Sequence, residues 1–449
     1  MPVHTQTSHL PYPPETVFDW HAQDGTFQRL TPPWEDVKVV AKDGGIEVGG
    51  RLELSAPIVA GVRGAWVAKH TFCERPLGFT DVQESGPFAS WVHEHRFHAD
   101  GDGTRMEDRI EWTAPLGPAG RVADPLIIRP RLEQMFAWRH ERLARDLRRH
   151  ADAETGPLRI AMTGASGLVG QELTAFLTTG GHTVVPLTRK RGGDGIFWDP
   201  QGGEVGPGLE DCDAVVHLAG AGIAEHAWTD EYKAVIKDSR TVGTRTLCNA
   251  LAKLPPKVLV TTSAIGIYGD RKDEPLDEHS PPGTGFLAEV GEAWEAAADP
   301  AREAGWRVAT VRVGLVLSAK GGLLGPLLTM FRAAGGGPVG TGQQWMSWVH
   351  VDDLVGLFHF LLTHPVDGAF NGVAPNPVRN AAFSKALGRA VNRPAVVPAP
   401  AFAVRMVLGR EKADELLLAS QRVAPRRALE AGFRFDEPDL DGALAFELG

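Results

Sequence analysis

The chain has 449 residues, of which 43% are hydrophobic, and its 46 Lys and Arg residues against 56 Asp and Glu residues give a formal charge of −10. This length is too great for one hydrophobic core, so we expect two or three domains. The acidic balance gives no general attraction to nucleic acid or to an anionic membrane surface, and we expect neither as a partner.

Cysteine usage and the start of the chain favour a cytoplasmic protein. The three cysteines, Cys73, Cys212 and Cys248, are far apart and lack the spacing of a metal or redox motif. The first residues have no basic start followed by an apolar run, and no apolar stretch is long enough to span a bilayer. We therefore expect a protein that is neither exported nor inserted in a membrane.

Four segments before residue 113 alternate apolar and polar residues, which predicts β-strands. They are RLELSAPI (51–58), RGAWVAKHTF (63–72), WVHEHRF (91–97) and TRMEDRIEW (104–112). A basic helical run over 131–149 follows, so we expect a domain over residues 1–150 in which a helix closes a sheet. The small, polar stretch at 151–157, which contains Gly and Pro, is the expected linker.

After the linker, short apolar strands alternate with helical segments, which predicts a doubly wound parallel α/β sheet of the Rossmann type over residues 158–374. The strands are RIAMT (159–163), HTVVPLT (182–188), DAVVHLAG (213–220), KVLVTTS (257–263) and RVATVRVG (307–314). Residues 375–449 are predicted to form a C-terminal helical lobe, with amphipathic helices at 381–392 and 413–423.

A glycine-rich stretch lies between the first strand and the helix that follows it. Gly164 permits a tight turn, Gly167 lets the backbone approach a pyrophosphate, and Gly170 lets the helix pack close to the strand. The pyrophosphate then faces unpaired N–H groups at the helix N-terminus. We therefore predict dinucleotide binding by this turn, and the residues assigned to it are Gly164, Ser166, Gly167, Leu168, Val169 and Gly170.

The end of the second strand indicates which dinucleotide is bound. An enzyme that uses NAD usually carries an acidic residue there, but this strand ends in Thr188 and is followed by Arg189, Lys190 and Arg191. A cluster of cations suits a 2′-phosphate, so NADP(H) is the predicted cofactor and Arg189 the predicted 2′-phosphate ligand.

The third strand of this region ends in the sequence His217-Leu218-Ala219-Gly220. Ligands of doubly wound sheets bind at the carboxyl ends of the strands, so Leu218, Ala219 and Gly220 are predicted to lie beside the cofactor. We interpret His217 as a packed strand residue rather than a catalyst, because it precedes the strand end.

Several motifs in this order resemble the extended, epimerase-like branch of the short-chain dehydrogenase/reductase superfamily. They are TGASGLVG (163–170), HLAG (217–220), TTSAIGIYG (261–269) and VRVGLVLS (311–318). Further segments resemble one uncharacterised epimerase-like subfamily that carries a C-terminal domain of unknown function: SRTVGTRTL (239–247), SWVHVDDLVG (347–356) and NGVAPNPVRN (371–380). The resemblance covers roughly residues 158–449 and implies NADP-dependent chemistry on a small molecule.

The resemblance implies a catalytic Tyr and Lys spaced by four residues on one helix. Tyr268 and Lys272 have this spacing, but the Gly and charged residues between them predict a loop. The superfamily's catalytic helix aligns with the later segment GTGFLAEVGEAWEAAADPARE, where Phe286 replaces the Tyr and Val290 the Lys. We therefore expect the usual catalytic pair to be absent.

Three other residues remain as catalytic candidates. Ser263, at the end of the fourth strand, matches the superfamily's substrate-orienting hydroxyl, and Tyr268 follows it in the predicted loop. His350 precedes two acidic residues, which is compatible with acid–base catalysis. In the alternative interpretation, Ser263 bonds to backbone and Asp352 or Asp353 caps the next helix.

The N-terminal part resembles the START-like, polyketide-cyclase-type ligand-binding domains, in which a curved sheet wraps around a long C-terminal helix. This resemblance implies an α+β helix-grip fold with an apolar cavity. Four strand aromatics are either cavity lining or ordinary core: Trp66, Trp91, Phe97 and Trp112. His93 and His95 share one strand face, with His98 nearby, but no thiolate or third ligand is evident and no metal site is predicted.

Two functional hypotheses of different classes follow. The first is an NADP-dependent oxidoreductase or epimerase-like enzyme that acts on a small molecule bound between the Rossmann core and the C-terminal lobe. The second is a non-catalytic NADP-binding sensor or scaffold, suggested by the absent catalytic pair. In either case the N-terminal domain is expected to bind an apolar ligand, which in a third variant the reductase half modifies. The oligomeric state is not predicted.

Overall fold

The computed structural model describes residues 1–59, 62–114 and 124–449. The chain divides into two compact units, one made mainly of Met1–Asp152 and the other of Ala153–Leu177 with His182–Leu448. The division falls inside the stretch that the sequence analysis predicts as a linker. In the ranges described above, we find no helix with both the length and the apolar character needed to cross a bilayer.

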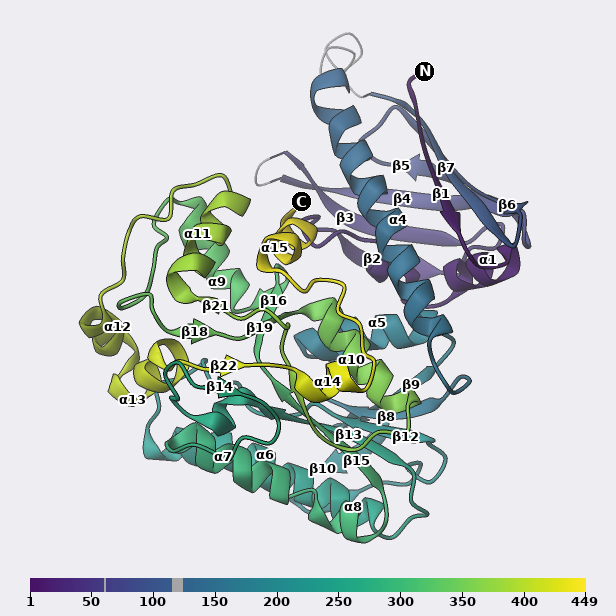
Figure 1. Ribbon diagram of the computed structural model, residues 1–449. Helices are drawn as coiled ribbons and strands as arrows, with labels where there is room; N and C mark the ends of the chain where they lie inside the picture. The colour runs from purple at the N-terminus through teal and green to yellow at the C-terminus, as the bar shows by residue number, and fades with distance from the viewer. Residues whose placement is uncertain (60–61, 115–123) are drawn as a thin grey trace. The chain divides into compact units, whose positions relative to one another are not determined.

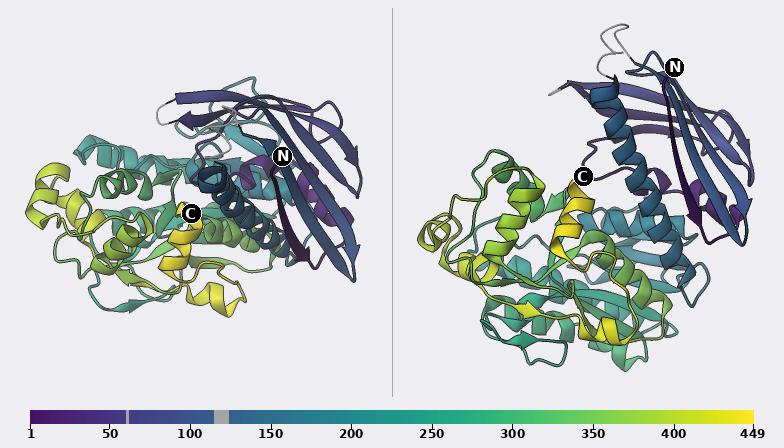
Figure 2. Two further views of the ribbon diagram at one scale, coloured as in Figure 1. Left: turned by 90° about the horizontal axis from the view of Figure 1, so that it is seen from above. Right: turned by 45° about the horizontal axis from the view of Figure 1, so that its top comes forward.

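The first unit is an antiparallel sheet with the strand order β1-β7-β6-β5-β4-β3-β2. Its strands are β1 (Val3–Leu10), β2 (Lys38–Asp43), β3 (Arg51–Val59), β4 (Val62–Glu74), β5 (Gly78–Ser85), β6 (Ser90–Asp100) and β7 (Gly103–Thr113). Its helices are α1 (Pro14–Ala22), α2 (Thr26–Arg29), a π-helical turn (Asp124–Ile128) and α4 (Arg129–Ala151). Figure 1 shows α4 running along one face of the sheet, and Figure 2 shows how strongly that sheet curves.

Alternation along the strands builds the interior of this unit. On β6, every second residue from Trp91 to Phe97 is buried, because successive side chains of a strand point to opposite faces. Both aromatics pack into apolar clusters with residues of α4. Trp112 is fully buried and donates its indole N–H to Asp124 at 2.7 Å. These three aromatics therefore pack as core, whereas Trp66 is only half-buried and packs against Trp91 at 5.1 Å between ring centroids.

The second unit is an α/β fold around an eight-stranded sheet with the order β11-β10-β9-β8-β12-β13-β15-β20. Its strands are β8 (Arg159–Thr163), β9 (Thr183–Thr188), β10 (Ile196–Asp199), β11 (Glu204–Val205), β12 (Ala214–His217), β13 (Val258–Ala264), β15 (Arg307–Val313) and β20 (Gly368–Gly372). All neighbours pair in parallel except β10 and β11. This confirms the predicted doubly wound parallel sheet.

Helices cover both faces of this sheet (Figure 1). One apolar cluster joins the strands to α5 (Leu168–Thr179) and α10 (Val351–Thr363), and another joins them to α6 (Asp230–Leu251) and α8 (Asp299–Glu303). The remaining helices are α7 (Phe286–Ala296), α9 (Leu324–Arg332), α11 (Asn380–Ala390), α12 (Ala401–Leu408), α13 (Arg410–Ala413), α14 (Arg426–Glu430) and α15 (Leu440–Leu448), with a 3₁₀ turn at Ile265–Tyr268 and a π turn at Asp414–Leu418.

Short strands outside the main sheet complete the unit. They are β14 (Pro275–Leu276), β16 (Leu315–Ser318), β17 (Gly321–Gly322), β18 (Trp345–Met346), β19 (Trp348–His350), β21 (Val378–Arg379) and β22 (Arg422–Val423). Because β22 pairs with β14, the C-terminal residues belong to this same unit. The predicted helix at 381–392 is confirmed as α11, but the one predicted at 413–423 is wrong beyond Leu418, where the chain extends into β22.

The strand order places a switch point between β8 and β12. From β8 the chain first builds outward through β9 and β10, and then returns to add β12, β13 and β15 on the other side. The crossovers on the two sides of β8 diverge, which leaves a crevice at the carboxyl ends of these strands. The functional residues of doubly wound sheets are found at this edge.

Candidate cofactor and substrate site

In the glycine-rich turn between β8 and α5, the backbone of Gly164 and the packing of Gly170 agree with a tight turn and a close approach of helix and strand. Gly164 has φ +69°, a left-handed conformation that disfavours other residues. A Cβ on Gly170 would overlap the carbonyl oxygen of Gly164 and approach the Cα of Ala165 to 2.8 Å, so this glycine permits close packing of helix and turn. A Cβ on Gly167 would meet only the Gly164 oxygen, at 3.3 Å.

The outer side of this turn is accessible. Ser166 and Gly167 are exposed, Leu168 and Val169 are half-buried, and α5 begins at Leu168. The first N–H groups of a helix lack intrahelical acceptors and carry partial positive charge. A pyrophosphate fits this position, because the Gly167 backbone leaves room for an approaching anion.

A buried threonine fixes the loop after β12 against this turn. Thr163 Oγ1 accepts hydrogen bonds from the backbone N–H groups of Leu218 at 3.1 Å and Ala219 at 3.2 Å. The same hydroxyl pairs with His217 Nδ1 at 2.8 Å, and His217 Nε2 pairs with Thr244 Oγ1 at 2.9 Å. Burial lowers the pKa of His217 to about 4. His217 is thus a neutral packed residue, as interpreted from the sequence.

The sequence analysis missed a second cation at this edge, Arg240 on α6. Its guanidinium lies 3.4 Å from where a Gly220 Cβ would stand, and it donates to the Ile236 carbonyl at 3.0 Å. Burial lowers its pKa to about 10. The only sequence signal for Arg240 was its place in the SRTVGTRTL segment, because no local pattern shows which strand end a helical Arg approaches.

The three cations after β9 have different surroundings. Arg191 pairs with Glu204 at 2.6 Å and lies over the Phe197 ring at 3.8 Å. Arg189 is exposed, and we find no ion pair or side-chain hydrogen bond for it within the described ranges. Arg189 is therefore available for a phosphate, whereas Arg191 already has a carboxylate partner.

Helix α7 begins where the resemblance places the superfamily's catalytic helix. Phe286 is its first residue, and Val290, one turn later, is buried. Tyr268 instead ends a 3₁₀ turn, and Lys272 follows in an exposed loop with φ +55°. The structure thus confirms that Tyr268 and Lys272 share no helix, and that α7 carries neither a Tyr at position 286 nor a Lys at 290.

Tyr268 is a core residue, and its catalytic role stays a prediction that its surroundings do not favour. Its side chain is fully buried, donates to Asn371 Oδ1 at 2.8 Å and accepts from Arg312 at 2.8 Å. Burial is the main factor that raises the pKa of the Tyr268 phenol. The short turn after β13 directs the ring inward, so a substrate cannot reach the hydroxyl without displacing these partners.

His350 likewise has structural partners, and its acid–base role stays a prediction that they do not favour. It is fully buried and is the N-cap of α10: its Nδ1 accepts from the Asp352 backbone N–H at 3.2 Å. Its Nε2 pairs with Glu447 at 2.9 Å. Asp353 accepts backbone hydrogen bonds from Asp436 and from residue 437. The SWVHVDD segment therefore anchors the C-terminal residues.

Ser263 remains as a candidate. It lies near the carboxyl end of β13 and is 2% exposed. Its hydroxyl has no hydrogen-bond partner in the part of the chain that the structure describes. A buried hydroxyl without a partner carries a desolvation cost, and such groups call for a bound molecule or another explanation. The alternative interpretation, a backbone-bonded Ser, is wrong for the described residues.

A pocket opens next to the end of β13, formed with the C-terminal residues. Its lining includes Ile265, Trp345, Asn380, Glu415 and Gln421. Glu415 accepts hydrogen bonds from the N–H groups of Phe286 at 2.9 Å and Leu287 at 2.8 Å. The sequence analysis missed Glu415, because a contact between residues this far apart in the chain has no local signal.

The fold defines a Rossmann-type protein with a glycine-rich turn between β8 and α5 and a pocket next to the end of β13. The model of the NAD dependent epimerase/dehydratase family matches residues 160–373. An epimerase family protein of Mycobacterium tuberculosis is 40% identical over 291 residues, which cover 64% of this chain and 96% of that relative. The chain belongs to the epimerase family, which confirms the resemblance seen in the sequence.

Two solved structures extend the comparison. The crystal structure of the human epimerase family protein SDR39U1 with NADPH has a TM-score of 0.60 and 35% identity, over 65% of this chain and 99% of that one. The crystal structure of the nucleoside-diphosphate sugar epimerase from Corynebacterium glutamicum has a TM-score of 0.81 and 35% identity, over 99% of this chain and 90% of that one. The second likeness includes the N-terminal unit.

Two further family models match the remaining parts of the chain. The model described as polyketide cyclase / dehydrase and lipid transport matches residues 10–136, which confirms the START-like resemblance of the N-terminal unit. A domain of unknown function matches residues 399–447. That segment contains Glu415 and Glu447, the two carboxylates that bind Phe286 and His350.

Proposed function

We propose that this chain is an NADP(H)-dependent oxidoreductase or epimerase-like enzyme that acts on a small molecule. The observation that carries the proposal is the turn from Gly164 to Gly170, whose accessible side offers helix N–H groups to a pyrophosphate. Arg189, for which we find no ion pair or side-chain hydrogen bond among the described residues, supports a 2′-phosphate at the end of β9. The NADPH in the structure of the human relative supports the same cofactor.

The substrate would lie in the pocket beside Ile265 and Glu415. When bound, the nicotinamide supplies or accepts a hydride. The chain's own part is to orient the substrate and to handle a proton at its oxygen. Ser263 is the residue that we assign to the substrate oxygen, because its buried hydroxyl is without a partner in the described ranges. Tyr268 and His350 are left out of this assignment because their polar atoms already have partners.

The cofactor assignment is tested by titrating the full chain with NADPH and with NADH. The expected result is tighter binding of NADPH. Arg189→Ala should weaken NADPH binding by about 10-fold to 100-fold and leave NADH binding unchanged, since a charge-assisted bond is lost. Arg191→Ala is the matched control, because Arg191 already pairs with Glu204. Equal binding of both nucleotides, or equal effects of the two substitutions, would overturn the NADP assignment.

Catalysis is tested by single-turnover oxidation of bound NADPH across a panel of carbonyl and enone compounds. Ser263→Ala should lower the rate by about 100-fold with unchanged NADPH affinity. The second candidate function, a non-catalytic NADP-binding sensor, is favoured by Phe286 and Val290 in place of the superfamily pair. Tight NADPH binding without oxidation of any compound in the panel would favour the sensor and count against the enzyme.

A further inference from the structure

A belt of polar side chains crosses the interior of the N-terminal unit. It lies between two apolar clusters, one that contains Phe97 and Met106 and another that contains Trp91, Trp112 and Phe136. Its members, the His–Asp belt, are Asp81 on β5, His93 and His95 on β6, Asp108 on β7 and His140 on α4. Buried ionisable groups are costly unless they are paired or bind a metal, so this belt requires a physical reason.

Strand register brings the belt together. Asp81 is paired with His93 between β5 and β6, and His95 with Asp108 between β6 and β7. His93 and His95 are two residues apart and therefore share a strand face. Both are only 5% exposed. His98 follows His95 by three residues on the same strand, so it belongs to the opposite face, and it is exposed.

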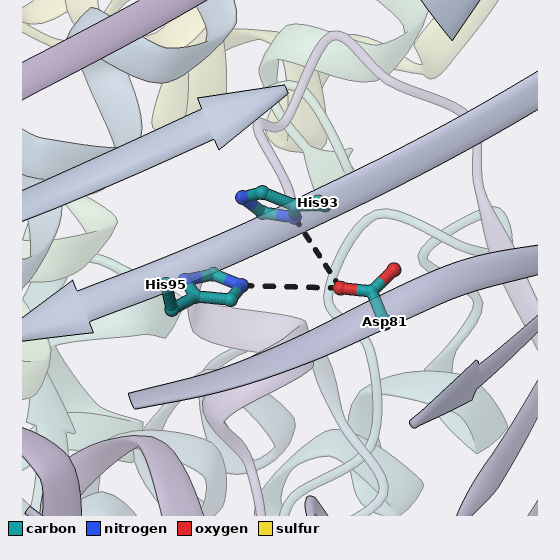
Figure 3. Close-up of side chains that lie close together, drawn as sticks. All are labelled: Asp81, His93 and His95. Atoms are coloured by element: carbon teal, nitrogen blue, oxygen red, sulfur yellow. Dashed lines mark ion pairs between the residues drawn. The ribbon is translucent and has the colours of Figure 1, made fainter. Parts of the chain in front are cut away.

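Three of these side chains converge on one point (Figure 3). Asp81 Oδ2 lies 3.4 Å from His93 Nδ1 and 4.0 Å from His95 Nε2. One ligand atom from each of the three side chains lies within 4.8 Å of the other two. Zinc bonds of about 2.0–2.2 Å to N and O place tetrahedral ligand atoms about 3.3–3.5 Å apart, so small side-chain movements would complete the geometry.

The opposite edges of both imidazoles face a single carboxylate. Asp108 Oδ1 lies 3.4 Å from His93 Nε2 and 2.6 Å from His95 Nδ1. Asp108 Oδ2 in turn contacts His140 Nε2 at 3.0 Å, and His140 Nδ1 pairs with Ser8 at 2.8 Å. Histidines that bind a metal commonly donate their other ring N–H to a carboxylate, which fixes the tautomer and the ring orientation. Asp108 Oδ1 lies at this edge of both rings, but neither ring nitrogen is aligned for a hydrogen bond to it among the described residues, so the orienting role requires a small rotation of the side chains.

We propose that Asp81, His93 and His95 bind a divalent transition-metal ion such as Zn²⁺ in the N-terminal unit, with Asp108 as the carboxylate that orients both histidines. Two imidazole nitrogens and one carboxylate oxygen form a ligand set suited to such ions. Three protein ligands leave a coordination position for water or for a ligand of this domain. Asp81, the most exposed ligand with 15% of its side chain accessible, marks the side of entry.

The charges around the belt are compatible with a bound cation. Asp81 and Asp108 contribute two carboxylates, and the half-buried Arg139 offsets one of them. Without a metal, burial lowers the pKa of His93, but Asp108 and Asp81 outweigh that effect and raise it to about 9. Burial and the neighbouring His93 lower the pKa of His95 to about 4. Histidine ligands bind a metal in their neutral form, so a titration is best run at mildly alkaline pH.

The test is a titration of the untagged full chain, stripped of metal with a chelator, with Zn²⁺ by calorimetry and with Co²⁺ by visible absorption. We expect one ion per chain. Asp81→Asn and His95→Gln should each weaken binding at least about 100-fold, and Asp108→Asn by about 10-fold to 100-fold, the usual effect of an orienting carboxylate. His98→Gln, on the outer face of the same strand, is the matched control and should bind like the unchanged protein.

Absence of saturable binding of either ion would overturn the proposal, as would equal affinities in Asp81→Asn, His95→Gln and His98→Gln. Circular dichroism checks that each variant is folded. If the ligand variants do not fold, the Co²⁺ spectrum of the unchanged chain decides. A spectrum of nitrogen and oxygen ligands supports the site, and a thiolate charge-transfer band contradicts it, because one of the free cysteines would then be a ligand.

Discussion

Glu415 holds Phe286 at the first position of α7, through a hydrogen bond of 2.9 Å from the Phe286 N–H to the carboxylate. The helix on which the superfamily carries its catalytic pair is thus started by a carboxylate from the C-terminal residues. The same carboxylate lines the pocket next to β13. The C-terminal segment therefore shapes both the helix and the proposed substrate site.

Removal of this carboxylate should destabilise the second unit. Glu415→Ala leaves the Phe286 and Leu287 N–H groups without their acceptor, and we expect a loss of about 1–2 kcal/mol in the free energy of unfolding. Glu411→Ala is the control. Because Glu411 makes an exposed ion pair with Lys233, its removal should lower the free energy of unfolding by less than about 1 kcal/mol. Urea unfolding measures both, and equal losses would contradict the capping role.

Alanine substitutions of Gly170 and Gly167 in the turn should have different effects on stability and on NADPH affinity. Gly170→Ala forces a Cβ into the turn backbone, so both the stability and the NADPH affinity should fall. Gly167→Ala brings a Cβ to 3.3 Å from the Gly164 oxygen, a milder contact than at Gly170, and places a methyl group where the pyrophosphate is expected, so the affinity should fall with a smaller loss of stability than in Gly170→Ala. Thermal unfolding and NADPH titration of both variants separate these effects. Unchanged NADPH affinity in Gly167→Ala would place the cofactor elsewhere.

Tyr268→Phe should affect stability and not cofactor binding. The substitution removes one hydroxyl and leaves Asn371 Oδ1 and the Arg312 guanidinium with one partner fewer in the core. We expect a loss of about 1–3 kcal/mol, measured by urea unfolding, with unchanged NADPH affinity. Loss of NADPH oxidation at full stability would instead restore the catalytic role predicted from the sequence.

The pair of His350 and Glu447 should make stability depend on pH. Burial alone lowers the pKa of His350, but Glu447 outweighs this and raises it above its ordinary value. A histidine whose pKa is raised in the folded state stabilises that state fully at pH values below its pKa in the unfolded chain, which is about 6.5. This contribution is lost as the pH rises through the pKa of the folded state. Glu447→Gln should therefore cost more free energy of unfolding at about pH 6 than at about pH 9.5. A cost that is the same at both would refute the pairing.

The parts of the fold that depend on local order along the chain were predictable. Each strand of the parallel sheet from β8 to β15 that we predicted is an apolar run bounded by a turn, and the role of Gly164 follows from its place between strand and helix. The sequence also showed that Phe286 stands where the superfamily has its catalytic Tyr, because this position can be located from the neighbouring motifs.

Contacts between distant residues account for what the sequence did not show. Tyr268 donates a hydrogen bond to Asn371, 103 residues later in the chain, and His350 pairs with Glu447, 97 residues later. The register that pairs Asp81 with His93 depends on β5, a strand that the sequence analysis did not predict. Patterns in a single amino-acid sequence show periodicity along the chain, but they do not show which carboxylate faces which histidine.

The most direct test of the proposed function is a crystal structure of the full chain with NADPH. We expect pyrophosphate oxygens within hydrogen-bond distance of the backbone N–H groups of Gly167, Leu168 or Val169, and the 2′-phosphate on the Arg189 guanidinium. A nucleotide bound away from this turn, or a 2′-phosphate with Arg189 directed into solvent, would contradict it.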